Sequence, residues 1–113
     1  MIDRSSAEAY ASWFRCLADA TRIQILNVLA RADAPLPVNE IVDAVGIGQS
    51  TVSAHLRRLE DLEFVFADRV GTASYFRVNR DCLTAFPAAA DVVMGRLPRA
   101  AAGDPLAAAP WHS

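Results

Sequence analysis

Lysine is absent from this 113-residue sequence, and histidine and cysteine are scarce. All eleven basic residues are arginine, the two histidines are His55 and His112, and the two cysteines are Cys16 and Cys82. Two widely spaced cysteines exclude the disulfide framework of a small secreted domain. With two histidines and no phosphate-cradling glycine loop, no nucleophile–base–acid constellation can be drawn, so we do not expect an enzyme.

Long apolar runs and a surplus of positive charge are also missing. No apolar stretch approaches the roughly 18 residues that a membrane span needs. Residues 1–6 lack the pattern of a secretory signal, so we expect a cytoplasmic protein without membrane contact. The formal net charge of −2 does not by itself indicate a nucleic-acid-binding protein. A surface that binds phosphate can, however, be confined to one part of a molecule whose overall charge is negative.

What is present is enough amphipathic sequence for one domain. A hydrophobic fraction of 53% with 21% charged residues is typical of an ordinary globular chain. We expect a DNA-binding and dimerisation domain over residues 6–94, for the reasons given below. Proline, glycine and alanine dominate residues 95–113, which predicts a flexible C-terminal tail.

Hydrophobic periodicity predicts four helices in the first half of the chain. Asp19 is placed to cap the second of them, and two prolines turn the stretch before the third into a connector. We expect a first helix with Tyr10, Phe14 and Leu17 on its apolar face, and a second helix at the centre of the core, with Ile23 among its buried residues. The four helices are expected at residues 6–17, 20–31, 38–45 and 49–62.

A tight turn separates the third helix from the fourth. Gly46 and Gly48 bracket Ile47 there, and we expect positive φ angles at this turn. Two short helices, a glycine turn and a longer helix are the signature of a helix-turn-helix.

After the fourth helix the periodicity becomes that of strands. Residues 64–70 and 73–79 predict two strands that Gly71 joins in a hairpin, and such a hairpin is a wing. A last helix is expected over residues 81–94, kinked or split by Pro87. The predicted fold is therefore mostly α with a β-hairpin wing (α+β), a winged helix-turn-helix.

The fourth helix has two faces of different chemistry. Val52, Leu56 and Leu59 recur at helical spacing and predict the buried face. The opposite face is short and polar, then basic, as a helix entering the major groove of DNA requires. The acidic residues Glu60, Asp61 and Glu63 should mark where DNA contact stops. The predicted DNA contacts on this helix are Gln49, Ser50, Thr51, Ser53, Ala54, His55, Arg57 and Arg58.

Several alternatives stay open for these residues. His55 is either a phosphate contact or a packing residue. On the wing, Arg69 and Arg77 are candidates for the minor groove or a phosphate, and a solvated strand arginine explains each equally well. The whole domain could also serve protein interaction, since fold does not fix function. A short, polar, arginine-bearing outer face favours DNA.

Three stretches of the chain resemble the ArsR/SmtB family of dimeric winged-helix repressors. They are LADATRIQIL at residues 17–26, GQSTVSAHL at residues 48–56 and YFRV at residues 75–78, and the similarity spans Phe14–Asn79. One departure is Glu63, where relatives usually carry the glycine that closes the recognition helix. The resemblance implies that the fourth helix reads double-stranded DNA.

The resemblance also implies a homodimer built from the first and last helices. Both helices carry apolar residues beyond what one small domain needs. A two-fold dimer places its recognition helices roughly 34 Å apart and selects an inverted-repeat operator. The residues that the last helix offers are Leu83, Phe86, Ala90 and Val93.

Family members commonly bind a metal or metalloid and then release DNA. The ligand positions of two family sites are not kept here. A Cys-Val-Cys run corresponds to Pro37-Val38-Asn39, and a four-ligand site on the last helix keeps only Asp81. A zinc or cobalt site of either kind is therefore not expected.

Cys16 and Cys82 remain, on the two helices expected to meet at the dimer interface. Thiolates without histidine favour soft ions, so arsenite, antimonite or another thiophilic ion is the predicted inducer, with no required cofactor. A thiol redox or sulfide-responsive switch is an alternative. The third possibility is that both cysteines are structural, as buried small hydrophobes.

Overall fold

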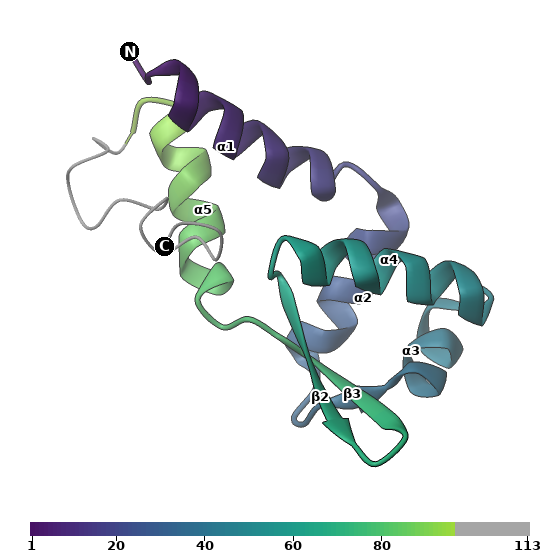
Figure 1. The fold of residues 1–113 in the computed structure, drawn as a ribbon. Helices are drawn as coiled ribbons and strands as arrows, with labels where there is room; N and C mark the ends of the chain where they lie inside the picture. Colours follow the sequence, from purple (N-terminus) through teal and green to yellow (C-terminus); the bar gives the residue numbers. More distant parts are fainter. Residues whose placement is uncertain (97–113) are drawn as a thin grey trace.

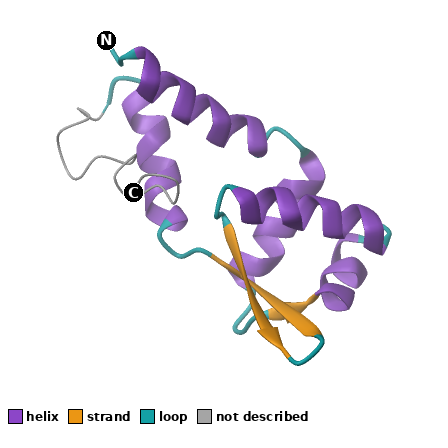
Figure 2. Ribbon diagram, viewed as in Figure 1, coloured by secondary structure: helices purple, strands orange, loops and turns teal. Residues whose placement is uncertain are grey.

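The computed structural model describes residues 1–96, which form five helices and a three-stranded antiparallel sheet of order β1-β3-β2. Helices α1 and α5 meet on one side of the molecule, and the β2–β3 hairpin projects from the other (Figure 1). Figure 2 shows the small sheet beside the helical body. The predicted winged helix-turn-helix is confirmed, with one additional strand. The elements are α1 (Arg4–Cys16), α2 (Ala20–Arg31), β1 (Leu36–Pro37), α3 (Val38–Val45), α4 (Gln49–Asp61), β2 (Val65–Val70), β3 (Ala73–Val78) and α5 (Cys82–Val93).

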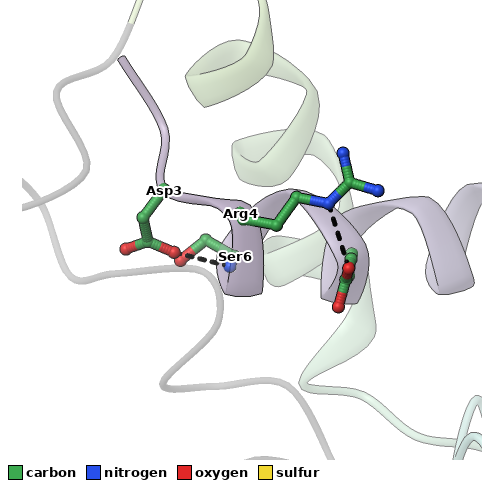
Figure 3. Close-up of polar contacts among 4 residues, drawn as sticks. Asp3, Arg4 and Ser6 are labelled. Atoms are coloured by element: carbon green, nitrogen blue, oxygen red, sulfur yellow. Dashed lines mark hydrogen bonds and ion pairs between the residues drawn. The ribbon is translucent and has the colours of Figure 1, made fainter.

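Carboxylates cap the first two helices. The Asp3 carboxylate accepts a hydrogen bond from the Ser6 backbone N–H at 2.7 Å, so α1 begins earlier than predicted (Figure 3). Asp19 caps α2 as predicted, since its Oδ1 accepts from the Arg22 N–H at 3.1 Å. The prediction that Ile23 is a core residue is wrong, because its side chain is 52% exposed.

The turn between α3 and α4 follows the prediction at one glycine only. Gly46 has a φ of 72° and donates its N–H to the Val42 carbonyl at 2.8 Å, which ends α3 in a left-handed cap. Gly48 has a φ of −58° and is the N-cap of α4, so the expectation of positive φ there is wrong. An N-cap takes extended backbone, which any residue adopts.

Helix α4 ends at an unusual residue. Among residues 1–96, Glu63 is the only non-glycine residue with a positive φ, at 55°. Its N–H donates to the Glu60 carbonyl and the Phe64 N–H donates to the Leu59 carbonyl, both at 2.9 Å, which is a Schellman motif. Glutamate thus occupies the left-handed position where relatives were expected to have glycine. The side-chain amide of Asn79 donates to the Glu63 carbonyl at 2.9 Å and holds this exit in place.

The wing pairs β2 with β3 from Val65 opposite Val78 to Val70 opposite Ala73. Strand β1 adds Leu36 opposite Phe76 on the other edge of β3. The sequence predicted a connector at this place, because a two-residue strand containing proline gives no period-2 signal.

Helix α5 runs without a break through Pro87, so of the predicted kink or split the split is wrong. Proline removes the hydrogen bond to the carbonyl four residues earlier, that of Leu83. Helix α5 has 12 residues, and the loss of this one hydrogen bond does not end it. Gly95, with a φ of 74°, follows the helix end, and the predicted tail lies outside the described residues from residue 97 onward.

An aromatic cluster joins α1 to α5 and to the end of α4. The Trp13 ring lies 5.7 Å from that of Phe64 and 5.9 Å from that of Phe86, and the Phe14 ring lies 5.3 Å from that of Phe86. Trp13 is fully buried, whereas Phe14 is half-buried. Trp13 therefore sits at the centre of the α1 apolar face that the sequence placed around Phe14. Among residues 1–96, no helix is long and apolar enough to cross a bilayer.

The strained exit of α4 yields a stability prediction. Replacing Glu63 by glycine removes a Cβ from the left-handed conformation, which costs an L-residue about 1–2 kcal/mol. The gain is reduced by the extra freedom of glycine in the unfolded chain. We expect Glu63→Gly to raise the free energy of unfolding by about 0.5–1 kcal/mol in urea denaturation.

Glu60→Gly is the matched control, because the same change inside α4 should lower the free energy of unfolding by about 1 kcal/mol. Equal losses of stability in both variants would contradict the strain at Glu63.

Candidate nucleic-acid interface

Helix α4 buries one face and exposes the other, as its sequence predicted. Val52, Leu56 and Leu59 are at most 1% exposed. The predicted contact residues lie on the remaining surface of the helix. Of these, Ser53 and His55 are half-buried, and the exposed ones are Gln49, Ser50, Thr51, Ala54, Arg57 and Arg58.

The first turn of α4 carries no side-chain cap. Its N-cap is Gly48, which offers no side-chain acceptor, and Gln49, Ser50 and Thr51 are all exposed. The first amides of a helix and the positive end of its dipole attract anions such as phosphate. This end of α4 can therefore accept a phosphate without displacing a protein group.

A groove of about 390 Å³ separates α4 from the wing. Arg57 of α4 and Arg69 of β2 both line it, together with Ser53. Glu60 also lines this groove, so its carboxylate lies beside the predicted contact surface. Two arginines and one glutamate therefore border the groove between helix and wing.

The two wing arginines have different partners. Arg69 donates to the Ser74 hydroxyl across the hairpin. Arg77 pairs with the Asp68 carboxylate at 2.9 Å, and its guanidinium lies 4.9 Å from the centre of the Phe66 ring. Both arginines are exposed, but Arg77 must leave an ion pair to reach DNA, whereas Arg69 gives up only a neutral hydroxyl.

One ring nitrogen of His55 accepts a hydrogen bond from another residue of the protein. The Arg22 guanidinium donates to His55 Nδ1 at 3.1 Å and to the Cys16 carbonyl at 3.1 Å. A neutral imidazole that accepts at Nδ1 carries its proton on Nε2. Arg22 thus links the end of α1 to the middle of α4. Sequence analysis missed this role, since nothing local shows that residues 22 and 55 meet.

The two thiols are buried in different surroundings. Cys16 is 1% exposed, and burial raises its pKa while the nearby positive charges of Arg22 and Arg58 oppose that rise. Cys82 is 5% exposed, and its Sγ lies 3.8 Å from the Glu63 carbonyl. Burial raises the pKa of Cys82 to about 11, with help from the negative charges of Asp81 and Glu63.

A metal centre within one protomer is not assembled here. Among residues 1–96, no three or more His, Cys, Asp and Glu side chains form a group that could hold a metal ion. The predicted site at Cys16 and Cys82 stays a prediction.

Comparison with known proteins identifies the family. Residues 19–66, which hold α2, α3, α4 and the start of the wing, match the model described as "Bacterial regulatory protein, arsR family". The "Probable mercury resistance operon repressor" of Streptomyces lividans is 38% identical over 98 residues, covering 87% of this chain and 70% of that protein. This chain belongs to the ArsR family of bacterial regulatory proteins.

Two further relatives agree with this assignment. The "HTH-type transcriptional regulator NmtR" of Mycobacterium tuberculosis is 40% identical over 70 residues, covering 62% of this chain but only 57% of that regulator's length. The solution structure of the homodimeric winged helix-turn-helix DNA-binding domain of Mb0332 from Mycobacterium bovis is 31% identical. It superposes with a TM-score of 0.65, covering 89% of this chain and 94% of that domain.

The buried thiol of Cys82 makes stability depend on alkaline pH. Its pKa is about 11 in the folded chain against an ordinary 9.0, so the unfolded chain loses the proton first as pH rises. The stabilisation is complete below pH 9 and is lost as pH approaches 11. The loss amounts to about 2 kcal/mol.

Urea denaturation at pH 8.5 and pH 10.5 measures this effect. Cys82→Ser should lose less free energy of unfolding than the unmodified chain over this interval. Because the chain contains no lysine, fewer side chains change their protonation between pH 8.5 and pH 10.5, and the effect of Cys82 is easier to measure. Equal losses in the two proteins would show that Cys82 ionises as readily folded as unfolded.

Proposed function

We propose that this chain is a homodimeric transcriptional repressor that binds double-stranded DNA through α4 and the wing. The observation that carries the proposal is the outer face of α4. This face combines an uncapped first turn, exposed small and hydroxyl side chains, and Arg57 facing Arg69 across a groove. These are the groups that a recognition helix uses for phosphates and base edges.

The proposed dimer interface lies on α1 and α5, which meet on one side of the molecule (Figure 1). Leu83 and Val93 of α5 are each 47% exposed, and Met94 just beyond them is 74% exposed. Apolar groups exposed along one helix are typical of an interface. The homodimeric Mb0332 domain supports this arrangement, which presents two copies of α4 to an inverted-repeat operator.

Salt-dependent binding tests the DNA proposal. A duplex selected by the protein from a random pool should bind with an affinity that falls steeply as salt rises. Arg57→Gln should weaken binding by about tenfold and reduce the salt slope by about one. Arg31→Gln, at an exposed position in the last turn of α2, is the matched control and should leave both quantities unchanged. Failure to bind any duplex at low ionic strength would refute the repressor.

We further propose that a thiophilic inducer acting at Cys16 or Cys82 releases the DNA. Arsenite, antimonite and mercury are the chemical candidates, because the family's histidine-containing ligand sets are missing and sulfur prefers soft ions. The name of the Streptomyces lividans relative supports a soft metal. A redox or sulfide-responsive switch at the same thiols is the alternative.

Serine variants test the inducer. Operator release by arsenite, by mercuric chloride and by peroxide should be measured by fluorescence anisotropy for Cys16→Ser and Cys82→Ser. At least one variant should bind the operator normally and lose the response. A response to arsenite or mercuric chloride indicates metal sensing, whereas a response to peroxide indicates oxidation of the thiol. If both variants still respond to every reagent, the cysteines are structural.

A further inference from the structure

The guanidinium of Arg22 is held between two acceptors on different helices. Its Nη1 donates to the Cys16 carbonyl at 3.1 Å, and its Nε donates to His55 Nδ1 at 3.1 Å. The Cys16 carbonyl lies in the last turn of α1, where carbonyls have no partner within the helix. The backbone N–H of Arg22 is bound in turn to the Asp19 carboxylate at 3.1 Å. A planar guanidinium fixed in this way restrains the orientation of the His55 ring.

The same hydrogen bond determines where the imidazole carries its proton. A ring nitrogen that accepts from Arg22 cannot also hold a proton, so the proton of His55 lies on Nε2. The charged groups around the ring oppose one another: the guanidinium groups of Arg22 and Arg58 disfavour an imidazolium, and the Asp19 carboxylate favours it. The hydrogen bond from the Arg22 N–H lowers the pKa of the Asp19 carboxyl, and a positive charge on His55 would lower it further. Because these charges offset each other, the bond at Nδ1 decides in favour of the neutral ring.

The Nε2 side of the ring remains for a partner outside the chain. Within residues 1–96, no protein acceptor takes the Nε2 proton. His55 is half-buried, and Thr51 and Arg58, one turn before and after it on α4, are exposed. His55 lies on the flank of α4 that contacts Arg22, beside the outward face. A side chain on the flank of a helix in the major groove lies nearer to the sugar–phosphate backbone than to the base edges.

We propose that Arg22 is a positioning residue, which presents the Nε2–H of a neutral His55 to a phosphate oxygen of the DNA backbone. The inference rests on the proposed repressor function and adds an uncharged contact to it. A neutral imidazole does not neutralise a phosphate and so releases no counterion. The contact therefore strengthens binding without adding to its salt dependence, in contrast to a contact made by Arg57.

The position of the proton can be measured without DNA. The chain has two histidines, so NMR of protein isotope-labelled only at the histidine nitrogens shows two rings, and His112→Gln assigns them. At pH 8.5 we expect His55 to be one fixed tautomer with its proton on Nε2. Arg22→Met keeps much of the side-chain length but removes both donors, so His55 should then show the averaged tautomers of a free imidazole. A proton on Nδ1 in the unmodified chain would overturn the proposal.

Operator binding, followed by fluorescence anisotropy at several salt concentrations, tests the phosphate contact. His55→Asn keeps an acceptor near the Nδ1 position but has no donor at the Nε2 position, which the amide of His55→Gln can reach. We expect His55→Asn to weaken binding about tenfold for every duplex with an unchanged salt slope, and His55→Gln to recover most of the affinity. A slope reduced by about one would show a charged ring. Either that result or a loss that depends on the base sequence would overturn the proposal.

A double-mutant cycle separates positioning from a merely structural role of Arg22. Arg22→Met should weaken operator binding about as much as His55→Asn, and the double variant should be no weaker than either, because the two residues act as one unit. Arg22→Lys keeps the positive charge without the planar fork and should not restore binding. Additive losses, or full binding by Arg22→Lys, would overturn the positioning role.

Two measurements keep the test decisive if a variant or the repressor function fails. If Arg22→Met does not fold, the His55 variants and the tautomer in the unmodified chain still decide the proposal. A chain that binds no duplex at low ionic strength would refute the repressor and with it the phosphate contact. The tautomer of His55 would then still show whether Arg22 orients the ring.

Discussion

The buried side chain of Asn79 holds the recognition helix, the wing and α5 in one arrangement. It is 6% exposed, and its amide donates to the Glu63 carbonyl while its Oδ1 accepts from the Asp81 N–H at 3.1 Å. Its backbone N–H donates to the Phe64 carbonyl at 2.8 Å, and its carbonyl accepts from the Cys82 N–H at 3.0 Å. Removing a partner from such a buried network leaves polar groups unsatisfied, at about 1–3 kcal/mol each. The direction that the chain takes after α4 therefore depends on Asn79.

A second polar link holds α4 at its middle. Arg22 joins His55 to the Cys16 carbonyl, so the end of α1 and the recognition helix share one guanidinium. The apolar contacts of Val52, Leu56 and Leu59 bury one face of α4 in the domain. The polar links at its middle and its end restrain it further. Each link lies beside one of the two cysteines, although the thiols have different surroundings.

The sequence predicted the elements that local patterns define. It missed the contacts between residues that are far apart in the chain. Apolar spacing and the Asp19 cap located the helices to within a few residues, whereas the departure from the family pattern at Glu63 left the geometry of the α4 exit open. Strand β1 was missed because its two residues become a strand only by pairing with β3. Asn79 and Arg22 were missed as anchors for the same reason, since their partners lie 16 and 33 residues away. Pro87 does not split α5, because the helix tolerates the loss of one backbone hydrogen bond among its 12 residues.

A protein of net charge −2 can still present a surface for DNA, provided that the charges are sorted along α4. The first turn is neutral and uncapped, Arg57 and Arg58 follow, and Glu60 and Asp61 close the helix. Phosphate is attracted to the first two sections and repelled by the third, so in the proposed complex this sorting favours contact through the first half of the helix. Glu60 shares the groove with Arg57 and Arg69 and lowers its net positive charge. Opposed charges of this kind favour orientation and specificity over raw affinity, as the proposed repressor function requires.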